Sequence, residues 1–580
     1  MLLAVAVAFT AMPDTGVYAG EVRQNLPMEG EISEAGEADI PVYRLVKKGE
    51  PSKSGYQDMV WVNEDGKEVT YEASRQKSRA RARVPFPSSY SMLDEGELPA
   101  VRNQGQWGTC WAHAAICSVE TNMVKKGLIA AEDVDYSERH LSYFSHRRNE
   151  ALGDGEDIFH DTYSWYGGGH HYSAIATLAS WSGAADERDY PYVSYGTMEN
   201  LAESDRSASV CHLTDANILS TPEDVKYAVM NTGALMCSYY SGDGTVESAQ
   251  GNVYHAEAHA IDHSVSLVGW NDNYPKTNFS DNGRMPENNG AWLCRNSWGP
   301  DCAENGYFWI SYEDATLTNF CSFEAESLDN YDCIYQYDGA GWNLGIGSEK
   351  VANVFTAESL EKLRAVSFYT NSNIDYLIEI YTGSGTSVKA PLDGTLAYSQ
   401  TGTVQHPGYH TISLDEEVLL AGGMKYAVSV KFLPKNGEQA FFCVEYGDSF
   451  SSEAGQSFLW DVVRWKDTQE YGYKNVCIKA FTDRVERVDK SDLLALIEEV
   501  ENLESADYVA ETWEKLCVKL EQAKAVCQAP DAAELEVIKA MRDLRAAKDS
   551  LAVSSIYLSD ENEFEAFAQE VLAGKDYDGQ

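Results

Sequence analysis

Cys110 stands in a setting that favours ionisation of a cysteine. It follows a turn-rich stretch, residues 101–109, and begins a predicted helix over 110–126 that Gly127 ends. Side chains on the first turn of a helix lie beside unpaired backbone N–H groups and the positive end of the helix dipole, which stabilise an anion. We therefore predict a lowered thiol pKa and a usable thiolate. The simpler alternative is a cysteine that serves packing alone.

Two more segments could supply the partners that a thiolate needs. His263 precedes an apolar, strand-like run, so the strand would fix its backbone while the imidazole projects toward a cleft. Asn296 follows a second such run and could accept the other imidazole N–H, which would orient the ring. Trp298 could keep water away from that hydrogen bond. A nucleophile, a base and a group that orients the base are the components of covalent catalysis.

The segments 101–112, 260–270 and 291–308 together resemble the papain-like cysteine peptidases. The resemblance covers about residues 90–320 and implies an α+β, two-lobed peptidase domain, which we place at 90–325. It also implies hydrolysis of peptide bonds through a thioester acyl-enzyme, with a peptide or protein as substrate and no metal or organic cofactor.

The resemblance assigns a role to each matching residue. Cys110 would be the nucleophile and His263 its general acid and base, while Asn296 would orient His263 and Trp298 would shield the bond between them. Gln104 would complete the oxyanion hole beside the Cys110 backbone N–H. Three further residues are implied to contact the substrate: Gly168, Gly169 and Asp262.

The sequence departs from the family pattern in two places. Trp107 stands where the family usually has a disulfide-bonded cysteine, so we expect a looser wall on one side of the cleft. Asn296 lies further from Cys110 than the family's usual range of about 130–150 residues. A polar insertion at 271–290, which we expect to form a surface loop, accounts for the excess.

Two metal-binding alternatives deserve comparison with this interpretation. His255, His259 and His263 are four residues apart and would line one face of a helix, as metal ligands do. However, no H-E-x-x-H motif is present, and His263 begins a strand. Asp272 and Asp281 could hold calcium in a loop, but the spacing is not that of an EF-hand. We therefore predict no metal site.

The region 331–483 has the pattern of an all-β sandwich. Three strand-length runs rich in β-branched and aromatic residues lie at 376–381, 426–432 and 476–481. The region resembles the lectin-like domain that follows the peptidase in some bacterial papain-like proteins. Contact with a glycan or the cell wall is one role, and bracing of the peptidase is the other. Trp342 could stack on a sugar ring, although core packing is the more common role of such a residue.

The C-terminal region changes to a helical period. Apolar residues recur every three or four positions over 489–552, which predicts three helices in a small bundle. This bundle resembles the FIVAR-type modules of Gram-positive surface proteins. Residues 553–580 are polar and acidic, and we interpret them as the start of a truncated further module.

The N-terminal region carries export and processing signals. Residues 1–19 have the apolar run and small-residue cleavage pattern of a signal peptide, with a buried N-terminal strand as the alternative. Residues 20–89 are charged and turn-rich, and we interpret them as a pro-segment or a linker. Their basic cluster, between Arg75 and Arg83, could be a solvated linker or a protease-accessible junction whose cleavage releases a pro-segment.

Composition excludes several classes of function. The 580 residues include 91 acidic and 45 basic side chains, a formal charge of -46, which disfavours nucleic acid and anionic membrane surfaces as partners. No apolar run is long enough to span a bilayer. The predicted signal peptide leads us to expect a secreted or cell-surface protein. The sequence predicts an exported cysteine endopeptidase with accessory domains. An exopeptidase or transpeptidase would use the same chemistry, and the alternative of another class is an adhesin whose peptidase fold lacks useful activity.

Overall fold

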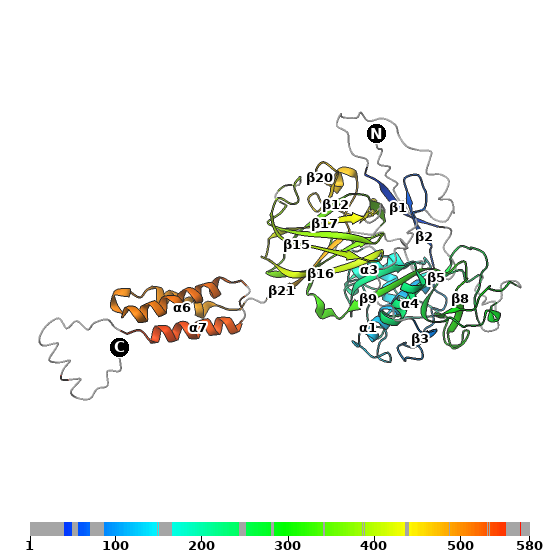
Figure 1. Cartoon of the computed structure of the whole chain (residues 1–580), viewed down its shortest axis with the longest axis horizontal. Coiled ribbons are helices and arrows are strands. Elements are labelled where there is room, and N and C mark those ends of the chain that lie inside the picture. Colours follow the sequence, from blue (N-terminus) through cyan, green and yellow to red (C-terminus); the bar gives the residue numbers. More distant parts are fainter. Residues whose placement is uncertain are drawn as a thin grey trace, which may run out of the picture. The chain divides into compact units, whose positions relative to one another are not determined.

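The computed structural model describes residues 40–48, 56–69, 86–147, 165–242, 251–279, 284–339, 343–385, 389–434, 440–485 and 488–552, apart from a few single positions (Figure 1). These residues fall into two units. The first extends to Asp483 without residues 359–361, and the second contains those three residues and the C-terminal helices.

One part of the first unit combines four α-helices with strands that belong to one large sheet. The helices are α1 (Cys110–Lys125), α2 (Glu138–Phe144), α3 (His171–Ala179) and α4 (Pro222–Asn231). The strands are β3 (Ser89–Ser91), β4 (His212–Leu219), β5 (Leu235–Tyr239), β6 (His263–Asn271), β7 (Ala291–Arg295), β8 (Tyr307–Ser311) and β9 (Thr318–Glu326). The order β4-β9-β5-β6-β7-β8 makes these strands one antiparallel run, and β3 pairs with β6.

Helix α1 is the central element of this part. It is almost entirely buried, and its few polar side chains, such as Glu120 and Asn122, are buried with it, as expected for a helix surrounded by other elements. Gly127, with a φ of +70°, follows its last turn, because glycine adopts that backbone conformation without strain. The predicted helix and its glycine stop are therefore confirmed.

The twelve strands that the structure describes from residue 333 onward surround a shared apolar core. They are β10 (Cys333–Tyr335), β11 (Leu344–Ile346), β12 (Lys350–Thr356), β13 (Glu361–Thr370), β14 (Ile374–Thr382), β15 (Thr395–Val404), β16 (Gly408–Leu420), β17 (Lys425–Pro434), β18 (Phe442–Val444), β19 (Ser457–Trp460), β20 (Trp465–Asp467) and β21 (Ile478–Arg484). All of these strands except β11 and β18 lie in two sheets. One sheet has the order β15-β14-β17-β12-β19-β20, and the other contains β10-β21-β13-β16. The three strand-length runs of the sequence fall in β14, β17 and β21, although β21 begins two residues later than expected.

A single sheet joins the two parts of the first unit. Strand β16 pairs with β4 at Gly408 and Asn217, so the strands of the β-rich region continue into those around α1. A Cβ atom on Gly408 would lie only 1.8 Å from the Ala216 carbonyl oxygen, so only glycine allows this approach. The regions that the sequence treats as consecutive modules therefore share a continuous hydrogen-bonded sheet.

Part of the predicted pro-segment or linker forms strands. β1 (Val42–Lys47) pairs antiparallel with β2 (Met59–Asn63) on one side and with β11 on the other. The resulting sheet, β18-β11-β1-β2, attaches the N-terminal segment to the β-rich region. The predicted signal peptide and the basic cluster between Arg75 and Arg83 lie outside the described residues.

The second unit contains three helices, α5 (Ser491–Glu501), α6 (Ala510–Gln528) and α7 (Glu534–Asp549). They pack around buried apolar side chains such as Leu496, Leu516 and Leu544. The FIVAR-type likeness stays a prediction, and nearly all of the predicted further module, 553–580, lies outside the described residues. Among the residues that the structure describes, no helix is long and apolar enough to cross a membrane.

Candidate active site

Cys110 is the first residue of α1, as predicted, and its side chain is fully buried. Its sulfur accepts hydrogen bonds from the backbone N–H groups of Ser264 and Trp111. Because Ser264 follows His263 on β6, the thiol and the imidazole occupy adjoining positions. The hydroxyl of Thr109, the residue before the helix, lies 2.5 Å from the hydroxyl of Tyr192.

The predicted lowering of the thiol pKa is wrong for the structure as it stands. Burial raises the pKa of Cys110 to about 12, and the N–H bonds from Ser264 and Trp111 only partly oppose it. Burial likewise lowers the pKa of His263 to about 4, against the opposing hydrogen bond to Asn296. Desolvation disfavours both charged forms, so the pair is a neutral thiol and a neutral imidazole while the site is covered.

The histidine is oriented as the sequence predicted. His263 Nε2 lies 2.9 Å from Asn296 Oδ1, and the indole of Trp298 stacks on the imidazole with ring centroids 4.7 Å apart. Nδ1 of His263 has no hydrogen-bond partner among the described residues. If Nε2 donates to Asn296, Nδ1 is the nitrogen that can accept a proton from Cys110.

Gln104 lies on the turn before α1 and is held on both sides of its amide. Its Nε2 donates to the Trp107 carbonyl at 2.8 Å, and its Oε1 accepts from the Ser297 hydroxyl at 2.7 Å. Nε2 carries two N–H bonds, so it can serve both the Trp107 carbonyl and a developing oxyanion. Ser297 was missed by the sequence analysis, although it stands between two residues that were assigned, Asn296 and Trp298.

A buried ion cluster beneath the site was also missed. The Arg102 guanidinium binds the Glu120 carboxylate and donates to Glu138 Oε1 at 2.6 Å. Both carboxylates are inaccessible to solvent, at 0% and 1% exposure. Burial alone would raise the pKa of Glu138, but the Arg102 guanidinium holds it below its usual value. The cluster joins the Gln104 turn to α1 and α2.

The predicted glycine pair lies against the N-terminal segment. Tyr56 forms a parallel bridge with Gly169, and the Gln57 N–H donates to the Gly169 carbonyl at 3.1 Å. A Cβ on Gly169 would lie 2.3 Å from the Trp111 indole, so this position requires glycine. The backbone at Gly169 therefore pairs with another segment of the chain, here one supplied by the N-terminal region. The carbonyl of the preceding residue, Gly168, accepts a hydrogen bond from the imidazole of His146.

Asp262 and Trp107 have structural partners. The Asp262 carboxylate accepts from the Ser241 N–H at 2.5 Å, and its contact with substrate stays a prediction. Trp107 donates to the Val193 carbonyl at 2.6 Å. Its indole belongs to a buried cluster, so apolar packing stands where the family usually has a disulfide: Trp107, Tyr143, Phe144, Trp165 and Met198.

The three histidines of the metal-binding alternative have other surroundings in the structure. His255 binds the Asp314 carboxylate at 2.9 Å, and His259 stacks on Tyr240, while His263 belongs to β6. The three residues do not share a helix. No group of three possible ligands occurs among the described residues.

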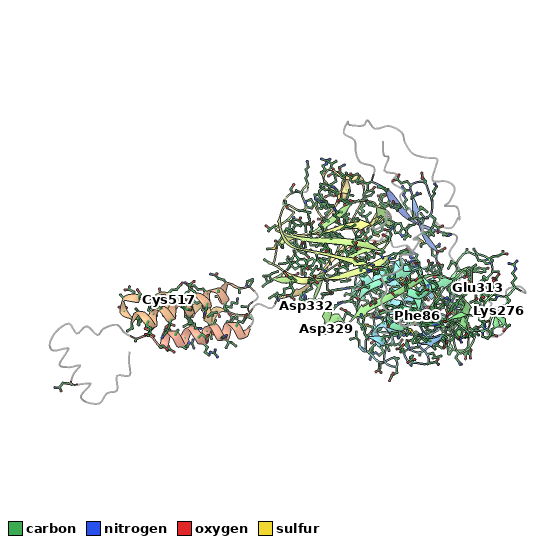
Figure 2. The ribbon with its side chains drawn as sticks, viewed as in Figure 1. Phe86, Lys276, Glu313, Asp329, Asp332 and Cys517 are labelled. Carbon is green, nitrogen blue, oxygen red and sulfur yellow. The ribbon has the colours of Figure 1, made fainter. Side chains whose placement is uncertain are left out.

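The loop after β6 is held by hydrogen bonds to the Glu313 carboxylate. Although burial opposes it, hydrogen bonds from the Asn288 side-chain amide and from the Glu287 and Asn288 N–H groups lower the pKa of Glu313, and Lys276 adds a smaller effect (Figure 2). Asp272 of the calcium alternative is bound by Lys226 at 2.6 Å, and Asp281 lies outside the described residues.

Comparison with known proteins identifies both parts of the first unit. Residues 86–330 match the papain family cysteine protease, and residues 334–482 match the lectin like domain. The crystal structure of the cysteine protease and lectin-like domains of Cwp84, a surface layer associated protein of Clostridium difficile, is 27% identical. It superposes with a TM-score of 0.58 and covers 69% of this chain and 89% of that one. A variant of Cwp84 after propeptide cleavage gives 26%, a TM-score of 0.59 and coverage of 69% and 100%.

Curated relatives such as the following match about two fifths of this chain. Cysteine protease 1 of Oryza sativa is 28% identical over 242 residues, which are 41% of this chain and 43% of that protein. Vignain of Phaseolus vulgaris is 24% identical over 39% of this chain and 54% of its own length. The chain thus spans about half the length of the curated relatives it matches.

Proposed function

Because residues 86–330 form a papain family cysteine protease domain, we propose that this protein hydrolyses peptide bonds of protein substrates through a thioester on Cys110. The observation that carries the proposal is the hydrogen bond from His263 to Asn296 under Trp298, beside the thiol at the start of α1. The adhesin alternative has no supporting observation of this kind.

Acylation follows from the positions of these groups. The Cys110 thiol transfers its proton to Nδ1 of His263, and the sulfur attacks the carbonyl carbon of the substrate. The negative charge on the carbonyl oxygen is stabilised by the Gln104 amide and the Cys110 backbone N–H, and each such donor contributes about 3–4 kcal/mol in other proteases. The C–N bond then breaks as His263 returns the proton to the leaving amine, and the acyl group stays on sulfur.

Deacylation uses the same base. His263 takes a proton from a water molecule, and the hydroxyl attacks the thioester carbon. The C–S bond breaks, the acid product leaves, and the thiolate is reprotonated. Asn296 keeps the imidazole in one orientation through both steps, because its Oδ1 accepts from Nε2 in the neutral and the charged ring.

Residues 40–69 act in this proposal as an inhibitory pro-segment. The backbone of Tyr56 pairs with that of Gly169, at the position where an extended substrate would bind. The anchor lies on the lectin-like domain, where β1 pairs with β11 and Phe441 lies 4.8 Å from the Tyr43 ring and 4.7 Å from the Trp61 ring. Cleavage in the basic cluster that follows would separate the pro-segment from the peptidase domain.

The accessory regions place the activity outside the cell in this proposal. The relative Cwp84 is described as a surface layer associated protein, and a signal peptide at residues 1–19 would export this chain. We propose that the lectin-like domain contacts a cell-wall glycan and that the FIVAR-type helices hold the enzyme near a Gram-positive surface.

The test compares the full chain with its Cys110→Ala variant on a panel of fluorogenic peptides under reducing conditions, after light trypsin treatment. Cys517→Ala, which alters a thiol of the helical unit, is the matched control (Figure 2). We expect cleavage by the parent and the control, and none by Cys110→Ala. Equal cleavage by all three proteins would refute the proposal. Cleavage within peptides blocked at both ends would identify an endopeptidase.

A further inference from the structure

Tyr56 is fully buried although it belongs to a segment that must leave before a substrate can bind. The Asn319 amide donates to its phenol oxygen at 2.7 Å. The hydroxyl of Ser238, itself completely buried, is a second hydrogen-bond partner of the same phenol group. The pocket that holds this ring therefore ends in polar groups matched to a hydroxyl.

The pocket adjoins the reacting sulfur. Ser238 Oγ lies 3.0 Å from Ser264 Oγ, and the Ser264 N–H donates to the Cys110 sulfur. The backbone of Tyr56 lies at the same time on Gly169. A side chain in this pocket thus belongs to a residue bound on the substrate-binding strand, close to the bond that would be cleaved.

The position of Asn319 is set by its backbone. It has a φ of +56°, a left-handed conformation that asparagine adopts more readily than most other residues. The pairing of β5 with β9 is irregular between Met236 and Ser238, opposite this point. Such an irregularity turns side chains out of the regular alternation. Asn319 also contacts the Asp58 carboxylate, so its amide is oriented by the pro-segment on two sides.

We propose that Asn319 and Ser238 form the floor of a substrate pocket that selects tyrosine over phenylalanine and aliphatic residues. The proposal rests on the proposed peptidase function and names its preferred substrate: an extended peptide with a tyrosine at the residue that pairs with Gly169. Phenylalanine would fill the same space but leave the buried amide and hydroxyl without the phenol oxygen. Sites built to bind a hydroxyl discriminate strongly against analogues that lack it, and we expect about a 10–100-fold preference from one such contact.

The kinetic test uses the trypsin-processed full chain and blocked fluorogenic peptides. A single tyrosine is moved through the four positions before the cleaved bond, with phenylalanine as its partner at each position. We expect one position at which kcat/KM is about 10–100 times higher for tyrosine. Asn319→Gly, which keeps the left-handed backbone and removes the amide, should abolish the preference by lowering kcat/KM for the tyrosine peptide toward that of its phenylalanine partner.

The chain offers a matched control for that variant. Asn305 has the same φ of +56° and is exposed, so Asn305→Gly repeats the backbone change away from the pocket and should keep the tyrosine preference. Ser238→Ala is a milder second variant, which should reduce the preference without removing any ring contact. Equal kcat/KM for tyrosine and phenylalanine at every position would overturn the proposal and leave the peptidase function intact.

A binding experiment tests the tyrosine preference of the pocket independently of catalysis. Fluorescently labelled peptides of residues 40–69, with and without Tyr56→Phe, are titrated by anisotropy against processed protein that carries Cys110→Ala. We expect the unchanged peptide to bind about 10–100 times more tightly, and this ratio to fall to about one with Asn319→Gly. Equal affinities, or a ratio that survives Asn319→Gly, would refute the tyrosine pocket even if no peptide were cleaved.

Discussion

Replacing Arg102 by methionine tests whether the ion cluster beneath the site holds the catalytic turn in place. Methionine has a similar length but no charge, so the change removes the cation and leaves the Glu120 and Glu138 carboxylates buried. Arg102 itself is only 16% exposed. Breaking a buried ion pair by removing one partner costs about 3–5 kcal/mol, because the remaining charge has lost its compensation.

The assay is thermal unfolding of the full chain at pH 7.5, followed by tryptophan fluorescence. Each kcal/mol shifts the midpoint by about 2–4 °C in domains of 150–250 residues, so we expect a fall of several degrees. Arg188→Met is the matched control, since Arg188 pairs with Asp186 in the same region but is 87% exposed. Exposed ion pairs contribute little to stability, and this control should unfold with the parent.

The pH dependence of the stability loss shows whether the buried carboxylates cause it. In the parent, Arg102 lowers the pKa of Glu138 in the folded state. This shift stabilises the fold at pH values above the unfolded-state pKa of the carboxyl group. The stabilisation is lost as the pH falls through the folded-state pKa. Burial already raises the pKa of Glu120 to about 7 in the parent, against the opposing effect of Arg102. Without Arg102, burial should raise the Glu138 pKa as well, above the unfolded value of about 4.3. The deficit of Arg102→Met should therefore shrink as the pH falls from 7.5 to 5. A deficit smaller than that of Arg188→Met, or one independent of pH, would refute the reasoning.

Three further predictions concern the site and its cover. Gln104→Ala should lower kcat of the processed enzyme about 100–1,000-fold, as removal of an oxyanion donor does; a fall below threefold would contradict the assignment. Phe441→Ala should release residues 40–69 faster after trypsin cleavage, measured by gel filtration, because the Tyr43 and Trp61 rings lose their common contact. Since burial raises the Cys110 pKa to about 12, iodoacetamide should label this thiol slowly at pH 7 in the intact chain and much faster after the pro-segment is removed; equal rates would contradict this.

Much of the candidate site could be predicted because its signals are local. Cys110 begins an apolar stretch with a glycine stop, and His263 and Asn296 each stand at the end of an apolar strand. These patterns depend on neighbours within a few residues, which periodicity and turn residues report directly. Gln104 and Trp298 followed from the family resemblance of the same short segments.

The remainder depends on contacts between distant parts of the chain. The pairing of Gly408 with Asn217 joins two sheets, and nothing in either local sequence indicates its partner. Tyr56 and Asn319 are separated by 263 positions, so no periodicity could relate them. Arginine is usually found at the protein surface, and only the fold shows that Arg102 contacts carboxylates that are buried. The error over the Cys110 pKa has the same origin, because burial depends on what covers the thiol.

The measurement that tests the central claim most directly is the mass of the acyl-enzyme. Processed protein is mixed with a slowly hydrolysed peptide ester, quenched in acid within seconds and analysed by intact-mass and peptide mapping. We predict one added acyl group on the peptide that contains Cys110, which hydroxylamine removes and which does not form in Cys110→Ala. Hydrolysis without an adduct on Cys110, or an adduct that persists in Cys110→Ala, would contradict the proposed mechanism.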